Sequence, residues 1–83
     1  MSRKITVYSK PRCVQCDQTK KILDRQGTEY ETIDISLPEN AEMLAAVKEL
    51  GYAGAPVVVV SSLDAPDEHW YGFRLDLIQG LAA

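Results

Sequence analysis

Residues 4–23 read KITVYSKPRCVQCDQTKKIL, and this stretch predicts a strand, a loop and a helix. The β-prone residues at 4–8 predict the strand. Pro11 predicts the loop, because proline does not fit a central strand. No glycine or proline interrupts residues 13–26, and Gly27 follows as a typical helix stop. Both cysteines of the stretch therefore lie where the exit loop of a strand becomes a helix.

The rest of the chain predicts an α/β architecture with the element order β-α-β-α-β-β-α. Ser36 is the expected N-cap of the second helix, and Pro38 lies in its first turn. A right-handed crossover makes the first two strands parallel, whereas the last two form an antiparallel hairpin. We therefore expect a four-stranded mixed sheet flanked by three helices. After the first helix, the predicted elements are a strand at 29–35, a helix at 36–50, strands at 57–60 and 68–71 around a turn at 61–67, and a helix at 76–82.

Length and composition predict one compact domain that spans residues 1–83. Hydrophobic residues make up 46% of the 83, which is enough for one small core. No apolar run approaches the ~20 residues that cross a bilayer. The first residues also lack the pattern of a secretory signal. We therefore expect a cytoplasmic protein with no membrane partner, and we also expect a monomer.

The net charge of −3 conceals two halves of opposite sign. Residues 1–25 carry seven basic and two acidic side chains, whereas residues 26–83 carry two basic and ten acidic ones. The overall acidity argues against nucleic-acid binding, which needs a basic face. The basic half is either an ordinary solvated surface or a local positive field for an anionic partner or a thiolate.

Cys13 and Cys16, spaced C-x-x-C, carry the strongest chemical signal. In a cytoplasmic chain such a pair is more often catalytic or metal-binding than structural. At a helix N-terminus, the peptide dipoles and the neighbouring Lys10 and Arg12 lower the pKa of the Cys13 thiol. Cys16, one turn further along, should be more buried. We therefore expect Cys13 to attack a partner disulfide and Cys16 to resolve the mixed disulfide.

A metal site is the main alternative for the two cysteines. A structural zinc site needs four ligands, and this chain adds only one histidine, His69, to the pair. His69 lies on a predicted strand and is interpreted as a surface residue. A metal site built from the cysteine pairs of two chains, an iron–sulfur cluster and a chemically inert pair stay open. We expect no bound metal.

The sequence resembles the glutaredoxins, and among them the NrdH redoxins, over essentially its whole length. The dithiol segment Tyr8-Ser9-Lys10-Pro11-x-Cys13-x-x-Cys16 and the later segment Ala55-Pro56-Val57-Val58 carry the likeness to glutaredoxins. The segment Trp70-Tyr71-Gly72-Phe73-Arg74-Leu75-Asp76 is similar to the Trp-Ser-Gly-Phe-Arg-Pro-Asp signature of the NrdH redoxins. Tyr71 and Leu75 depart from that signature.

The resemblance implies a thioredoxin-like fold and a dithiol electron carrier with thiol–disulfide oxidoreductase activity. It also implies that no cofactor is bound and that electrons come from NADPH through thioredoxin reductase and pass to class Ib ribonucleotide reductase. A cis peptide bond is implied between Ala55 and Pro56, in a loop that pairs with an extended partner segment. The residues expected to contact partners are Lys10, Arg12, Val14, Gln15, Ala55, Pro56, Trp70, Phe73 and Arg74.

Three of these residues have an alternative role. Trp70 either caps the core or contacts the reductase, because exposed aromatic residues anchor interfaces. The same choice applies to Phe73. Arg74 either locks the turn by a local hydrogen bond or pairs with a partner.

A glutathione-dependent glutaredoxin is the second functional hypothesis. Glutaredoxins hold glutathione with a lysine like Lys10, the cis-proline loop and a Gly-Gly turn followed by aspartate. Here Tyr71 replaces the first glycine and Leu75 occupies the aspartate position, with Asp76 one residue late. We therefore expect weak or no glutathione binding. The same departures disfavour a third hypothesis, a dimeric iron–sulfur carrier, because glutathione normally completes that cluster.

Overall fold

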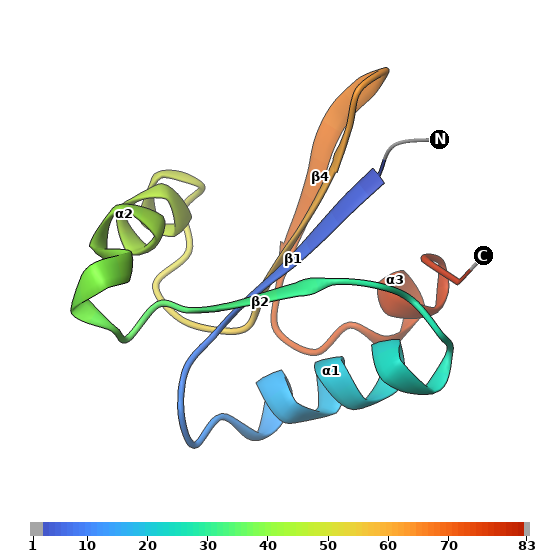
Figure 1. Ribbon diagram of the computed structural model, residues 1–83, viewed down its shortest axis with the longest axis horizontal. Coiled ribbons are helices and arrows are strands. Elements are labelled where there is room, and N and C mark those ends of the chain that lie inside the picture. The colour runs from blue at the N-terminus through green and yellow to red at the C-terminus, as the bar shows by residue number, and fades with distance from the viewer. Residues whose placement is uncertain (1–2, 83) are drawn as a thin grey trace.

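A four-stranded mixed sheet forms the centre of the computed structural model, which describes residues 3–82 (Figure 1). The strand order is β2-β1-β3-β4. Strand β1 (Arg3–Ser9) runs parallel to β2 (Glu31–Asp34) and antiparallel to β3 (Val57–Ser62). Strand β4 (Ala65–Tyr71) pairs with β3 in antiparallel register. The predicted order of elements and the mixed sheet are thus confirmed.

Helices cover both sides of this sheet, as predicted. Helices α1 (Val14–Arg25) and α3 (Leu75–Gln79) lie together on one side, and α2 (Ala41–Glu49) lies on the other (Figure 1). A short 3₁₀ turn, η1 (Pro38–Asn40), leads into α2. Within residues 3–82, no helix has the length and apolar character that crossing a membrane requires.

Apolar packing divides into two clusters. The larger one joins the sheet to α1 and α3 and consists of Ile5, Val7, Leu23, Val58, Val60, Trp70, Ile78 and Leu81. The smaller one consists of Cys13, Cys16, Ile35 and Ala55, with Leu44 of α2 packed against it. Both cysteines are therefore held among packed side chains rather than on an open loop.

The predicted start of the second helix is wrong. Ser36 is not its N-cap: the Ser36 backbone N–H and hydroxyl both donate to the Asp34 carboxylate, at 2.8 and 2.6 Å. Those two donors hold the pKa of Asp34 below its usual value, the hydroxyl contributing most. The N-cap positions are instead Leu37 for the 3₁₀ turn and Asn40 for α2, so Ser36 belongs to the local turn that precedes them. The last helix is also shorter than predicted, since it ends at Gln79.

The predicted turn at residues 61–67 is also wrong. Strand β3 continues to Ser62 and β4 begins at Ala65, so Leu63 and Asp64 alone form the hairpin turn. Pro66 lies inside β4, which is an edge strand. An edge strand tolerates proline, because one row of its N–H groups has no partner strand.

Replacing Leu23 by alanine is expected to lower the free energy of unfolding by about 2–5 kcal/mol. Leu23 is fully buried in the larger cluster, so the substitution leaves a cavity. Urea denaturation followed by circular dichroism measures the loss. Leu63→Ala is the matched control, because Leu63 is 89% exposed and its loss should cost less than about 0.5 kcal/mol. Equal losses in the two variants would contradict this packing.

Candidate functional site

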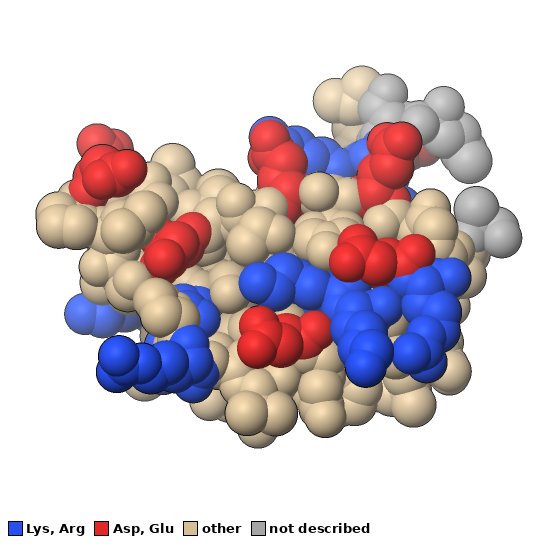
Figure 2. All heavy atoms as spheres, turned by 60° about the horizontal axis from the view of Figure 1, so that its bottom comes forward, with Lys and Arg blue, Asp and Glu red and all other residues tan. Residues whose placement is uncertain are grey.

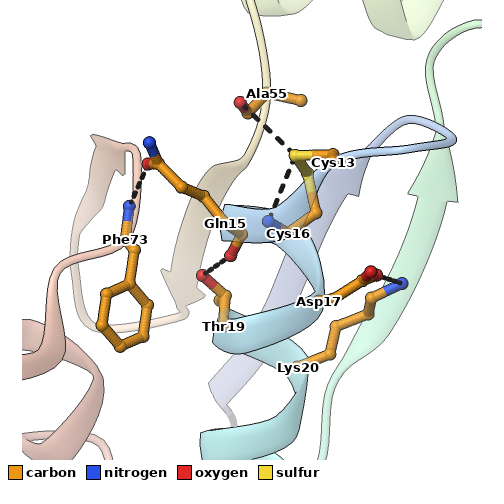
Figure 3. Close-up of a disulfide and its surroundings, with 8 residues drawn as sticks. All are labelled: Cys13, Gln15, Cys16, Asp17, Thr19, Lys20, Ala55 and Phe73. Atoms are coloured by element: carbon orange, nitrogen blue, oxygen red, sulfur yellow. Dashed lines mark hydrogen bonds and ion pairs between the residues drawn. A yellow bond between two sulfur atoms is a disulfide. The ribbon is translucent and has the colours of Figure 1, made fainter.

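The two cysteines form a disulfide at the N-terminus of α1 (Figure 3). Cys13 is the N-cap residue, with φ −116° and ψ 102°, and its Cα lies 5.2 Å from that of Cys16. The Cys16 backbone N–H donates to the Cys13 sulfur at 3.1 Å. A sulfur in this position receives an N–H group that has no partner within the helix. The same N–H is placed to stabilise negative charge on that sulfur after reduction.

The two sulfur-bearing residues differ in exposure. Cys13 is 8% exposed, whereas Cys16 is fully buried. The expected difference in burial is thus confirmed. Because thiol–disulfide exchange needs direct access of one sulfur to another, a partner can approach the pair only at Cys13.

The loop before β3 lies against the Cys13 sulfur. The Ala55–Pro56 peptide bond is cis, as the resemblance implied, and the Pro56 side chain is buried. The Ala55 carbonyl oxygen lies 3.8 Å from the Cys13 sulfur. Since a disulfide sulfur carries no hydrogen, this approach is a van der Waals contact. It places a backbone edge directly beside the sulfur that a partner would reach.

Gln15, between the two cysteines, reaches across the site. Its side-chain oxygen accepts a hydrogen bond from the Phe73 backbone N–H at 3.0 Å, over a separation of 58 residues (Figure 3). The preceding N–H along the chain, that of Gly72, donates to the Pro56 carbonyl at 2.8 Å. The segment after β4 thus touches both α1 and the cis-proline loop. No local sequence signal predicted these contacts, because an amide side chain does not specify a distant backbone partner.

Basic side chains lie on the helix that carries the dithiol and on the loop before it. Lys10 and Arg12 are exposed on the loop that leads to Cys13, and Arg12 has a φ of 57°. Figure 2 shows Lys and Arg side chains over the face that contains α1, with acidic side chains between them. Asp17, for example, lies 3.9 Å from the Lys20 ammonium group. The positive charge closest in sequence to Cys13 therefore comes from Lys10 and Arg12.

The structure favours local roles for Trp70 and Arg74. Trp70 is only 6% exposed and packs in the larger cluster, which favours the core alternative over a contact with a reductase. The Arg74 guanidinium donates to the Asp76 carboxylate at 3.1 and 3.3 Å, and these bonds hold the pKa of Asp76 below its usual value. Arg74 thus locks the start of α3. Phe73 is half-buried beside the larger cluster.

The remaining predicted contact residues divide by exposure. Ala55 and Pro56 are buried, so they can offer a partner only their backbone. Val14 is 70% exposed, and Lys10, Arg12 and Gln15 are exposed as well. These four side chains are thus accessible to a partner and lie within three residues of Cys13 in the sequence.

His69 belongs to an aromatic group that sequence reasoning missed. Its Nδ1 lies 2.9 Å from the Tyr52 hydroxyl, and Tyr52 stacks on Tyr71 with ring centres 6.0 Å apart. The Tyr71 ring also covers Gly54, next to the cis-proline loop. Across residues 3–82, no three side chains of the His, Cys, Asp and Glu types gather into a set that could hold a metal ion.

Comparison with known proteins agrees with this geometry. The glutaredoxin family model matches residues 5–62. The glutaredoxin-like protein NrdH of Escherichia coli is 38% identical over 79 residues, which cover 94% of this chain and 88% of the relative. The NrdH protein of Lactococcus lactis is 39% identical over 78 residues, covering 94% and 99% of the two chains.

Solved structures share the same architecture. The NrdH-redoxin of Escherichia coli, which is described as having a thioredoxin-like activity profile, superposes with a TM-score of 0.73 at 36% identity and covers 96% of both chains. A glutaredoxin from Archaeoglobus fulgidus superposes with a TM-score of 0.73 at 24% identity, covering 94% of this chain and 84% of its own. The predicted thioredoxin-like fold is confirmed.

Limited alkylation of the reduced protein by iodoacetamide is expected to modify Cys13 before Cys16. Cys13 is the more exposed residue, and its sulfur accepts an N–H bond that favours the reactive thiolate. Mass-spectrometric fragmentation of the peptide 13–20 locates the label. In concentrated urea the helix is lost, and both cysteines should react at similar rates. Equal labelling in the folded protein would contradict the assigned geometry.

Proposed function

The chain belongs to the glutaredoxin family and to its NrdH-type members, which are thiol–disulfide electron carriers, and we propose that it supplies electrons to class Ib ribonucleotide reductase. Thioredoxin reductase would reload the carrier with electrons from NADPH, and the carrier itself would work without a bound cofactor. The observation that carries this proposal is the Cys13–Cys16 disulfide at the N-terminus of α1, of which only Cys13 can be reached. We further propose that the protein is a cytoplasmic monomer.

Cys13 is the proposed nucleophile and Cys16 the proposed resolving residue. The Cys13 thiolate attacks one sulfur of a partner disulfide, forms a mixed disulfide and displaces the second partner sulfur as a thiolate. The Cys16 thiolate then attacks the Cys13 sulfur and displaces the remaining partner sulfur. Two electrons pass to the partner, whose two thiolates take up protons, and the carrier is left with its internal disulfide. NADPH then returns two electrons through the reductase.

The loop before β3 is the proposed docking edge. An extended partner segment could pair with the Ala55 backbone while its sulfur faces Cys13, which lies 3.8 Å from the Ala55 oxygen. Around this edge the exposed Lys10 and Arg12 favour a partner segment that carries acidic residues. Recognition through backbone groups makes few demands on the partner's side chains. That tolerance suits a carrier that must bind both a reductase and an acceptor.

Weak use of glutathione is the second part of the proposal. Tyr71 and Leu75 occupy positions where the resemblance placed glutathione contacts. The Tyr71 ring lies over Gly54, and the Asp76 carboxylate is already paired with Arg74. Two of the groups that would hold the small peptide, the first glycine of the turn and the aspartate after it, are thus replaced, and the nearby Asp76 is already paired.

Serine substitutions test the proposed roles of the two cysteines. Cys13→Ser is expected to abolish the reduction of protein disulfides, because the attacking sulfur is lost. Cys16→Ser should instead accumulate a mixed disulfide with the partner, because no second sulfur releases it. An insulin-reduction assay measures the loss of activity, and non-reducing electrophoresis of the same mixtures detects the mixed disulfide. Trapping by Cys13→Ser instead of Cys16→Ser would reverse the assignment.

NADPH oxidation tests the electron source. The oxidised protein is mixed with NADPH and either thioredoxin reductase or glutathione plus glutathione reductase. We expect turnover with thioredoxin reductase and little with glutathione. Turnover only in the mixture with glutathione and glutathione reductase would contradict the proposal and identify a glutathione-dependent glutaredoxin. Addition of class Ib ribonucleotide reductase then tests the acceptor, and the Cys13→Ser variant provides the blank.

A further inference from the structure

We propose that Gln15 is a positioning residue that holds the cis-proline loop at its working distance from Cys13. Gln15 acts on the loop indirectly, through hydrogen bonds that both make with the segment that follows β4. The inference deepens the proposed function and rests on it in one respect, namely that a partner segment docks on this loop. Its physical basis is a chain of three contacts that begins and ends at the dithiol.

The first contact fixes Gln15 to the segment after β4. The Gln15 side-chain oxygen accepts from the Phe73 N–H at 3.0 Å. The backbone end of Gln15 is held as well, because its carbonyl accepts from the hydroxyl of the fully buried Thr19 at 2.8 Å. Figure 3 shows the amide of Gln15 extended from α1 toward Phe73. Gln15 is thus held at its backbone and at its side chain, and it can fix the segment after β4 relative to α1.

The second contact joins the segment after β4 to the cis-proline loop. The Gly72 N–H donates to the Pro56 carbonyl at 2.8 Å, and Gly72 directly precedes Phe73. Gly72 has a φ of +86°, and a Cβ built on it would lie 3.2 Å from the Gln15 side-chain oxygen. A left-handed backbone and this close approach both favour glycine. The turn is therefore fitted against Gln15 on one side and against Pro56 on the other.

The third contact returns to the sulfur. Ala55, which precedes Pro56, places its carbonyl oxygen 3.8 Å from the Cys13 sulfur. A partner segment paired with this backbone would present its own sulfur to Cys13 at a distance that the loop determines. Exchange rates depend steeply on such alignment. The residue between the two cysteines thus sets the geometry in which one of them reacts.

The Gln15–Phe73 bond lies at the surface, so its loss can change the position of the loop without lowering the stability of the fold. Gln15 is exposed, so water can replace its oxygen at the Phe73 N–H when the side chain is shortened or changed. Loss of the bond should therefore leave the fold intact. It should affect only reactions in which the partner uses the loop, and a small disulfide that meets Cys13 alone should not depend on it.

Three variants test the proposal. Gln15→Met keeps the length of the side chain and removes the acceptor, whereas Gln15→Glu keeps an acceptor. Gln18→Met is the matched control, since Gln18 is an exposed glutamine in the same helix. For each reduced protein we measure the second-order rate constants for insulin disulfides and for a small aromatic disulfide. Gln15→Glu is measured at a pH at which Cys13 is fully ionised, because the added carboxylate raises the pKa of that thiol.

Gln15→Met is expected to slow insulin reduction about three- to tenfold, as the loss of one hydrogen bond predicts. The rate with the small disulfide and the urea midpoint should not change, Gln15→Glu should restore the insulin rate, and Gln18→Met should match the wild type. Amide hydrogen exchange should accelerate at both Phe73 and Gly72 in Gln15→Met. Faster exchange at Phe73 alone, with an unchanged insulin rate, would overturn the proposal.

The same measurements separate this inference from the proposed function. If the wild-type protein reduced neither disulfide, the proposed carrier function would fail. Exchange at Gly72 would still decide whether Gln15 holds the loop. Equal loss of both rates in Gln15→Met would contradict a positioning role, because it would mean that the substitution acts on Cys13 itself.

Discussion

The antiparallel pairing of β1 with β3 is the constraint on which the site depends. Tyr8 near the end of β1 lies opposite Val57 at the start of β3. The loop that leaves β1 and the loop that enters β3 therefore meet at one end of the sheet, although Cys13 and Ala55 are 42 residues apart. The start of α1 then adds N–H groups that need an acceptor, and the Cys13 sulfur receives one of them. Strand pairing and helix capping together place a reactive sulfur beside an open backbone edge.

The same arrangement makes the two cysteines chemically different. Cys13 caps the helix and is slightly exposed, whereas Cys16 faces the packed cluster and is fully buried. In the proposed cycle a partner sulfur meets only Cys13, and Cys16 can react only with the sulfur next to it. An internal attack needs no second encounter, so the mixed disulfide is short-lived. The buried position of Cys16 thus favours a carrier that releases its partner.

Local sequence signals predicted most of the fold, and the errors arose where distant residues decide. The helix stop at Gly27 is encoded within a few residues, and its φ is +76°. Pro66 led to the wrong prediction of a turn. Its place on an edge strand follows from the order of the whole sheet, which neighbouring residues do not specify. The burial of Trp70 could not be settled from its neighbours, because α1 and α3 supply the covering side chains. The Gln15–Phe73 bond could not be predicted for the same reason, since its partners meet only after the sheet, α1 and α3 have assembled.

The segment that resembles the NrdH signature is far from the cysteines in sequence, yet its successive residues contact the cis-proline loop and the start of α1. The Tyr71 ring covers Gly54, the Gly72 N–H binds the Pro56 carbonyl, and the Phe73 N–H binds Gln15. Tyr71 departs from the signature, but its ring adds a contact to the loop and leaves the two backbone hydrogen bonds in place. From this segment those bonds require only backbone N–H groups in a turn that admits Gly72, and the Phe73 bond also needs the Gln15 side chain as its acceptor. The chain can therefore vary the outer side chain of this segment while it keeps the backbone contacts that align the dithiol.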